Sequence, residues 1–214
     1  MFRDGEKIAM QSILQSLFIG ISIAAIPGPI FFELVRRTLS RGFIPGALLS
    51  VGEFFGNFLL LSLVFFGVSH FLTQDVVRAA LFLSGAVILL YLAICAVRLQ
   101  PAEIEASYDK RISHRGSVLT GFLIAVSNPV ITALWVSLSG SYLSKLPSTS
   151  SALIHIFLIS FGFVIFFVSL AAIVHATRSR ILPKHVVLFS KVFGVILFGY
   201  AVYFIDQLGV ILLR

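Results

Sequence analysis

The residues best suited to do chemistry are a carboxylate and an amide on one face of an apolar segment. Glu53 lies about nine residues after Ile44, near the start of that segment, so the helical rise of about 1.5 Å per residue places it roughly 14 Å deep. That depth is close to the centre of a hydrocarbon core about 30 Å thick. A carboxylate there costs at least ~2.5 kcal/mol, so we expect Glu53 to face a helix-bundle interior or water. Asn57 follows one turn later on the same face.

Two interpretations compete for each of these side chains. Glu53 either exchanges a proton or contacts a cationic group, or it is a neutral carboxyl that is hydrogen-bonded in a packed interface. We favour the functional interpretation of Glu53. Asn57 offers a donor and an acceptor, which suits a zwitterionic ligand and suits a hydrogen bond between helices equally well. Both interpretations of Asn57 stay open.

Two breaks in apolar segments are the second set of candidates. Pro27-Gly28-Pro29 interrupts the first segment, and Asn128-Pro129 interrupts the fourth. Proline lacks an N–H group and clashes with the preceding turn, so neither helix can continue regularly. Freed backbone groups at membrane depth are tolerated only beside protein or a water-filled cavity. The breaks therefore predict a substrate site, with packing kinks as the alternative.

The composition indicates that these residues lie in a membrane protein. The chain is 58% hydrophobic and 12% charged, with a mean hydropathy of +1.05, which excludes disorder and argues against a soluble domain. A single cysteine, Cys95, excludes an internal disulfide and a multi-cysteine metal site. The sequence contains no phosphate loop, no hydrolase nucleophile motif and no zinc-protease motif, so we predict no enzyme activity, no cofactor and no metal site.

Six apolar segments are each long enough to span a membrane as a helix. We predict an all-α integral membrane protein with two inverted three-helix halves, at residues 12–97 and 116–214. An N-terminal tail at residues 1–11 and a loop at residues 98–115 complete the division. Breaks at matching positions of inverted halves are typical of a transporter site. The predicted spans are residues 12–35, 44–68, 76–97, 116–140, 152–176 and 186–205.

The basic residues predict the orientation of these spans. They concentrate in the first, third and fifth connections, which the positive-inside rule assigns to the cytoplasm. Both termini are then on the outer side of a bacterial plasma membrane. A cleaved signal peptide is disfavoured because the first apolar run continues to Val35 and a basic cluster follows it. Since these bases lie between apolar runs, the net charge of +7 indicates topology rather than binding of nucleic acid.

Small residues at four-residue spacing predict two close helix contacts. Gly52 and Gly56 form a G-x-x-x-G stripe in the second span, and such stripes let a neighbouring backbone approach closely. Ser117, Gly121 and Ala125 form a similar stripe in the fourth span. We interpret both stripes as helix-packing seams.

Three further side chains are assigned to the membrane interfaces. Glu33, three residues before Arg36, is predicted to neutralise that basic cluster near the interface, with a place at the cytoplasmic mouth as the alternative. Trp135 lies towards the outer end of the fourth span and fits an interfacial aromatic belt. His155 starts the fifth span and is predicted to anchor it at the outer interface.

The order of these motifs resembles the LysE/RhtB-type amino-acid exporters. Pro27-Gly28-Pro29 in the first span precedes a basic cluster, and Ser40-Arg41-Gly42 then leads into the G-x-x-x-G span. Asn128-Pro129 in the fourth span matches the second signature of these exporters. The resemblance covers essentially the whole chain. It implies export of amino acids or their derivatives from the cytoplasm, coupled to the proton gradient.

Two other functions remain alternatives. The same superfamily contains metal-ion exporters, and Glu53 and Asn57 would then supply the oxygen ligands that hard cations prefer. A membrane scaffold without transport activity is the third reading, in which both breaks are packing kinks. The expected partners are a small-molecule substrate and the lipid bilayer. The sequence leaves the oligomeric state open, a homo-oligomer included.

Overall fold

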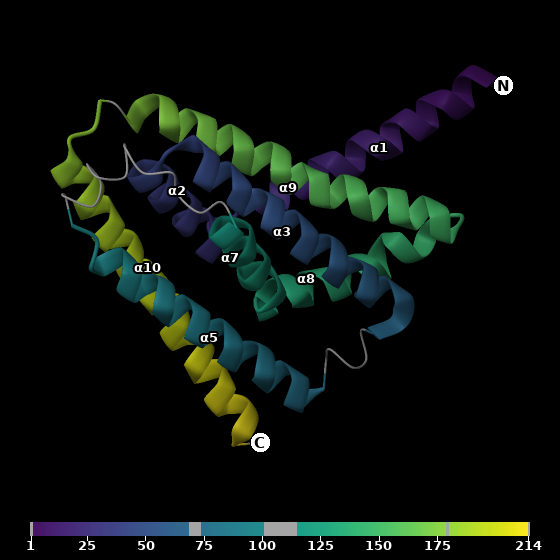
Figure 1. The fold of residues 1–214 in the computed structure, drawn as a ribbon. Helices are drawn as coiled ribbons and strands as arrows, with labels where there is room; N and C mark the ends of the chain where they lie inside the picture. The colour runs from purple at the N-terminus through teal and green to yellow at the C-terminus, as the bar shows by residue number, and fades with distance from the viewer. Residues whose placement is uncertain (1, 69–73, 101–114, 179, 214) are drawn as a thin grey trace.

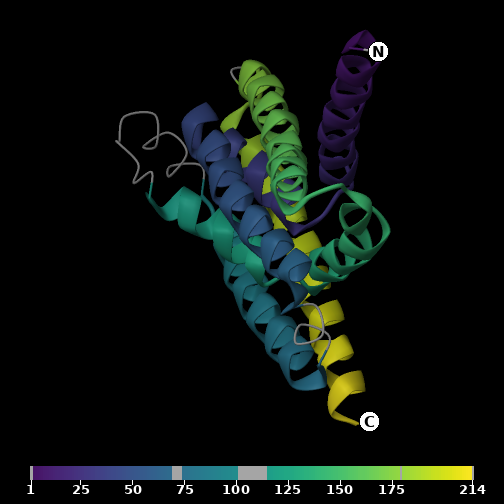
Figure 2. The same ribbon diagram turned by 90° about the vertical axis from the view of Figure 1, so that its right-hand side faces the viewer.

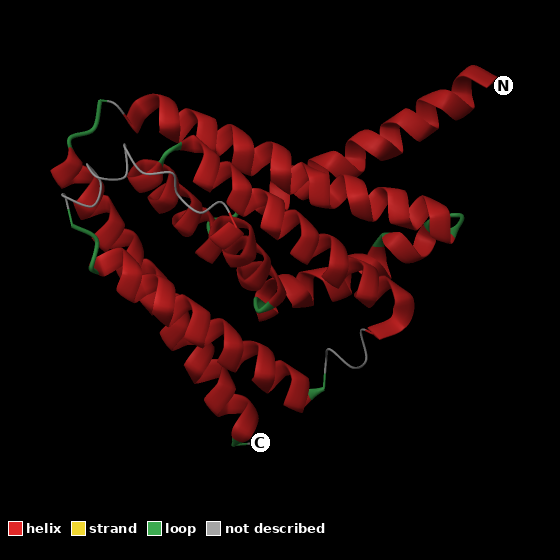
Figure 3. Cartoon of the chain, viewed as in Figure 1, coloured by secondary structure: helices red, strands yellow, loops and turns green. Residues whose placement is uncertain are grey.

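The computed structural model describes residues 2–68, 74–100, 115–178 and 180–213, and every regular element in these ranges is a helix (Figure 3). Four helices are long and apolar enough to cross a membrane. Two bent helix pairs raise the number of candidate spans to six if each pair is one span. The predicted all-helical class is therefore confirmed, and the predicted loop at 98–115 lies mostly outside the described residues.

The first half of the chain follows the predicted spans closely. The first span is divided at the proline break, and the second ends in a short π-helical turn that contains Gly67 at φ 94°. The N-terminal helix already begins at Phe2, so the segment predicted as a tail continues the first helix. The elements are α1 (Phe2–Ala24), α2 (Pro29–Arg41), α3 (Phe43–Leu63), η1 (Val64–Val68) and α5 (Asp75–Val97).

The second half repeats this plan. A divided helix comes first, and two long helices follow it. The last helix runs on beyond the predicted end at residue 205. The elements are α7 (Arg115–Val126), α8 (Pro129–Ser141), η2 (Leu143–Lys145), α9 (Thr149–Arg178) and α10 (Pro183–Leu212).

The helices pack mainly as three pairs, α1 with α9, α3 with α7, and α5 with α10. In Figure 1 the turn between α2 and α3, the end of α9 and the start of α10 lie together at the upper left. From there the α5–α10 pair diverges from the other helices, and Figure 2 shows the chain termini at opposite extremes of the molecule. The α1–α9 and α3–α7 contacts run parallel, whereas α5 and α10 are antiparallel.

A repeated stripe of small residues explains why two of these pairs are so close. Ser16, Gly20 and Ala24 on α1 have the same types and spacing as Ser117, Gly121 and Ala125 on α7, and all six are buried. A Cβ atom added to Gly20 would collide with the Ile159 carbonyl of α9, and one added to Gly121 would collide with the Leu49 carbonyl of α3. The α1–α9 and α7–α3 contacts are therefore equivalent, with α7 in the place of α1 and α3 in the place of α9.

The core lies between α3, α8 and α9, where Trp135 is fully buried against Phe163 with ring centroids 5.7 Å apart. The predicted place of Trp135 in an interfacial belt is therefore wrong. Burial inside the helix bundle removes the apolar ring from water, so the ring needs no place at the lipid interface. A second apolar cluster fills the space between α5 and α10.

Candidate functional site

The first helix break produces a bend of 76° between α1 and α2. Gly28 is the N-cap of α2 and Pro29 its first residue, so no side chain caps the free N–H groups of this helix end. The first bond of the helix runs from Phe32 N to Gly28 O over 3.3 Å, so it uses none of the N–H groups that precede Phe32. The positive end of the α2 dipole therefore stays open.

The second break bends α7 against α8 by 63° and is capped differently. Asn128 is the N-cap of α8, and its Oδ1 accepts hydrogen bonds from Val130 N at 3.1 Å and Ile131 N at 3.4 Å. The Thr132 hydroxyl in turn donates to the Asn128 carbonyl over 3.0 Å. The α8 end is thus closed by its own side chain, whereas the α2 end is not.

The two breaks meet at one cavity of about 150 Å³. The Tyr200 hydroxyl of α10 donates to the Pro27 carbonyl over 3.0 Å and so holds the first break against the second half of the chain. No charged side chain is among the described residues that line the cavity. The lining residues are Ile23, Ile26, Pro27, Gly28, Pro29, Asn128, Val130, Ile131, Leu134, Tyr200 and Phe204.

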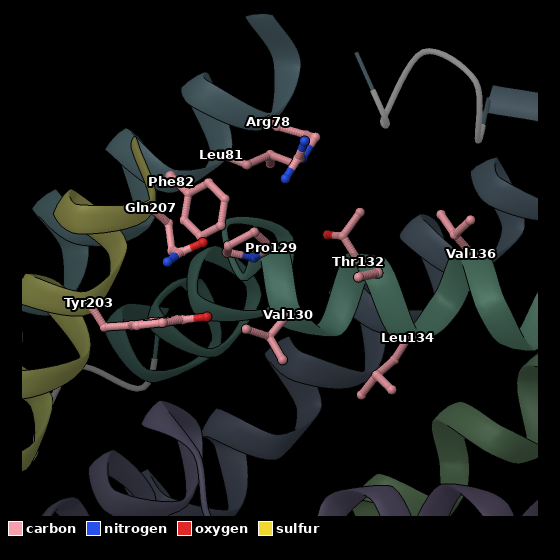
Figure 4. Close-up of a pocket in the computed structure, with 11 residues that line it drawn as sticks. Arg78, Leu81, Phe82, Pro129, Val130, Thr132, Leu134, Val136, Tyr203 and Gln207 are labelled. Carbon is pink, nitrogen blue, oxygen red and sulfur yellow. The ribbon is translucent and has the colours of Figure 1, made fainter. Parts of the chain in front are cut away.

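A larger cavity of about 530 Å³ lies on the other side of the first turns of α8, between α5 and α10 (Figure 4). Val130 and Leu134 line both cavities, so this part of α8 is the wall between them. Pro129 lines the larger cavity only. The larger cavity carries four polar side chains, namely Arg78, Thr132, Tyr203 and Gln207. Arg78 is paired with Asp75 over 3.2 Å at the exposed start of α5.

Glu53 and Asn57 are buried on α3, with exposed fractions of 3% and 1%, and line neither cavity. Their side chains are neighbours on one face of α3. Nevertheless, Glu53 Oε2 and both polar atoms of Asn57 have no hydrogen-bond partner among the described residues. Buried polar groups are normally satisfied, so this pair has unused hydrogen-bonding capacity.

The small-residue stripes lie beside this polar pair. Gly52 faces the Val118 carbonyl of α7, and Gly56 faces Ala125 and the Phe122 carbonyl. Gly121 lies against the Leu49 carbonyl and the backbone N of Glu53. Ser117, at the start of the α7 stripe, accepts a hydrogen bond from Arg37 of α2. The stripes thus hold α7 against the helix that carries Glu53.

Comparison with known proteins decides the family. The LysE type translocator family model matches residues 21–208, which is most of the chain. The chain belongs to the LysE-type translocators. Its family and its long apolar helices make it a multi-pass membrane protein.

Two relatives resemble this LysE-type translocator over part of their length. "Putative amino acid efflux protein YcgF" of Bacillus subtilis is 30% identical over 138 residues, which cover 64% of this chain and 66% of the relative. "Chemotactic transduction protein ChpE" of Pseudomonas aeruginosa is 29% identical over 128 residues, or 60% of this chain and 63% of the relative. The matched region is therefore just under two thirds of either relative. No solved structure matches the translocator.

The structure corrects the place of His155 in this translocator. The side chain is 5% exposed, and its Nδ1 lies 2.5 Å from Ser16 Oγ and 3.0 Å from the Tyr142 hydroxyl. It therefore joins α1 to α9 and to the end of α8 rather than anchoring α9 at an interface. The Ser16 stripe of α1 is the sequence signal that would have indicated a buried partner here.

Glu33 is bonded to the basic cluster, as the sequence predicted, but it is fully buried. Its carboxylate accepts from Arg36 Nε and Nη2 at 2.8 Å each and from Arg37 Nε and Nη2 at 2.9 and 2.6 Å. The two arginines are themselves only 3% and 5% exposed. Sequence spacing indicated the ion pairs but gave no sign of their depth.

Proposed function

We propose that this translocator is a secondary exporter of amino acids or their derivatives from the bacterial cytoplasm. The observation that carries the proposal is the meeting of both helix breaks at one cavity. Broken helices that face each other across two halves are the usual substrate site of such transporters. The cavity is smaller than the about 300–1,000 Å³ of drug-sized sites, which suits a small solute.

The chemistry of the cavity fits an amino acid with an apolar side chain. The uncapped N-terminus of α2 offers free N–H groups and a positive dipole to a carboxylate. Backbone carbonyls at the ends of α1 and α7 are acceptors for an ammonium group. The remaining walls are apolar, with Ile23, Val130 and Phe204 among them.

The packing supports six spans in two inverted halves. In such a topology the first and fifth spans cross the membrane in the same direction, as do the second and fourth spans. The third and sixth spans cross in opposite directions. The α1–α9 and α3–α7 contacts are parallel and the α5–α10 contact is antiparallel, which agrees with this arrangement. With the basic connections in the cytoplasm, both termini are outside.

Glu53 is proposed as the proton-exchanging group. It is a carboxyl within the bundle, one of its oxygens has no hydrogen bond to a described residue, and it lies on a helix packed directly against α7. A conformational change at the α7–α8 break would therefore alter its surroundings. Export driven by the proton gradient needs one such group.

A divalent-metal exporter is the second candidate, favoured by the unused oxygens of Glu53 and Asn57. Two protein oxygens are few for a hard cation, since Ca²⁺ takes about six to eight oxygen ligands. Among the described residues, no group of three or more His, Cys, Asp or Glu side chains is arranged to hold a metal ion. Amino-acid export therefore remains the better supported function.

The proposal is tested by reconstituting the protein with the variant Pro27→Ala/Pro29→Ala. The variant should let α1 continue as a regular helix, so it should express at the normal level but lose efflux of preloaded amino acids. Pro183→Ala, which alters a proline at the start of α10, is the matched control and should transport normally. Normal efflux by the double variant would reduce the breaks to packing kinks. A wild-type protein that moves no amino acid but lowers internal Zn²⁺ or Mn²⁺ would favour the metal exporter, and no transport at all would favour a scaffold.

A further inference from the structure

The Glu33 cluster contains more positive than negative charge. One carboxylate is bonded to two guanidinium groups, those of Arg36 and Arg37, so the bonded group has an excess of one positive charge. Arg41 and Cys95 also lie within electrostatic range of Arg36 or its neighbours. Among the described residues, Glu33 is the one carboxylate bonded to these guanidinium groups. A buried charge without a counter-ion is costly, so the cluster favours a second anion.

The cluster also joins the two halves of the chain. Arg37 Nη1 donates to the Ser117 hydroxyl over 3.1 Å, and Arg37 Nη2 lies 3.3 Å from the Thr120 hydroxyl. These contacts hold the last turns of α2 against the first turns of α7. They lie at the end of the molecule that the basic connections assign to the cytoplasm. In contrast, the cavity with Arg78 and Gln207 lies beside the start of α5 and the end of α10, away from these contacts.

The Arg37 N–H groups that donate to the Ser117 and Thr120 hydroxyls are the donors that an incoming carboxylate would bind. Guanidinium forks bind carboxylates in pairs of parallel hydrogen bonds, which are stronger than bonds to neutral hydroxyls. Arg37 uses Nε and Nη2 on Glu33 and spends its Nη1 on Ser117. A second carboxylate would neutralise the cluster and draw Arg37 away from α7.

We propose that Arg36 and Arg37 form a carboxylate-binding site at the cytoplasmic entrance, half-filled by Glu33, and that a ligand carboxylate arriving there releases α2 from α7. The site rests on the proposed export function and gives it an entrance that recognises the carboxylate of the solute. While the entrance is closed, the carboxylate of Glu33 itself occupies one of the two carboxylate positions beside the arginines. The Ser117 and Thr120 contacts are then the closed latch.

Cys95 is a natural reporter of this entrance. It is the only cysteine in the chain, it is half-buried on α5, and it lies near Arg36. Reaction of Cys95 with a maleimide in proteoliposomes should be slow while the latch is closed. Ser117→Ala/Thr120→Val removes both latch hydroxyls and should raise the labelling rate at least tenfold, since the loss of even one hydrogen bond to a charged group has about that effect. Ser84→Ala, on the same helix as Cys95, should leave the rate unchanged.

The ligand part of the test uses acetate as the carboxylate probe. Sodium acetate should speed the labelling of the wild-type protein severalfold, whereas acetamide and sodium chloride at the same concentration should not. Arg37→Lys keeps the charge but not the planar fork, so it should abolish the acetate effect. Equal effects of acetate and acetamide, or an unchanged rate in the latch variant, would overturn the proposal. Because neither readout measures amino-acid efflux, failure of the site is distinguishable from failure of the exporter function.

Discussion

The substitution Glu53→Gln separates a proton-exchanging carboxyl from a structural one. Glutamine keeps the shape and hydrogen-bonding capacity of the side chain but cannot ionise. Glu53 Oε2 has no hydrogen bond to lose within the described part of the chain, and Asn57 Oδ1, which likewise has no partner there, can accept from the new amide one turn away. The change in stability should therefore stay within about 1 kcal/mol, the net value of one hydrogen bond. Expression and oligomer profile should match the wild type.

The effect on transport should be much larger. Exchange of one proton for each neutral solute in a potential of about 100 mV supplies ~2.3 kcal/mol. This energy corresponds to roughly a fifty-fold concentration ratio, at ~1.4 kcal/mol for each factor of ten. We expect the Glu53→Gln variant to lose this ratio and to retain exchange of labelled for unlabelled solute, which needs no net proton movement.

Proteoliposomes with an imposed proton gradient measure both activities in one preparation. Ser62→Ala is the matched control, since Ser62 Oγ is another buried α3 atom without a hydrogen-bond partner among the described residues. This control should keep both gradient-driven efflux and exchange. Undiminished gradient-driven efflux by Glu53→Gln would remove Glu53 from the coupling mechanism. Loss of both activities with normal folding would instead assign Glu53 to substrate binding.

Three further predictions test the packing, the topology and the hold on the first break. Gly121→Leu should prevent stable insertion because its side chain would collide with the α3 backbone, whereas Gly199→Leu, with open space around it, should express normally. Equal yields of the two variants by fluorescence-detected size exclusion would contradict the close α3–α7 contact. Cysteine probes on a Cys95→Ser background should react with an impermeant maleimide from outside at Ser148 and not at Ser107, and the reverse pattern would invert the topology. Tyr200→Phe removes the hydrogen bond to the Pro27 carbonyl, which is worth ~1 kcal/mol or slightly more, so efflux should fall about tenfold while the control Tyr203→Phe keeps its rate. An unchanged rate in Tyr200→Phe would show that this bond does not position the break.

The spans and the breaks could be predicted from the sequence because they depend on local properties. A run of apolar residues long enough to cross the hydrocarbon core has few alternatives to a helix in a membrane. Proline removes a donor and clashes with the preceding turn wherever it occurs inside a helix, so bends at Pro29 and Pro129 follow from the residue type alone. The ion pairs of Glu33 were also predictable, since Arg36 and Arg37 lie one turn away.

The arrangement of these local features in space required the tertiary structure. The two breaks are about a hundred residues apart in the sequence, and only the packing of α8 and α10 against the first break brings them to one cavity. The sequence predicts interfacial places for Trp135 and His155 because hydropathy depends on position along a helix and not on the direction in which a side chain points. Both point into the bundle, where Phe163 and Ser16 are their partners. Hydropathy and proline content thus determine which segments span the membrane and where they break, whereas contacts between distant helices decide which polar groups share a site.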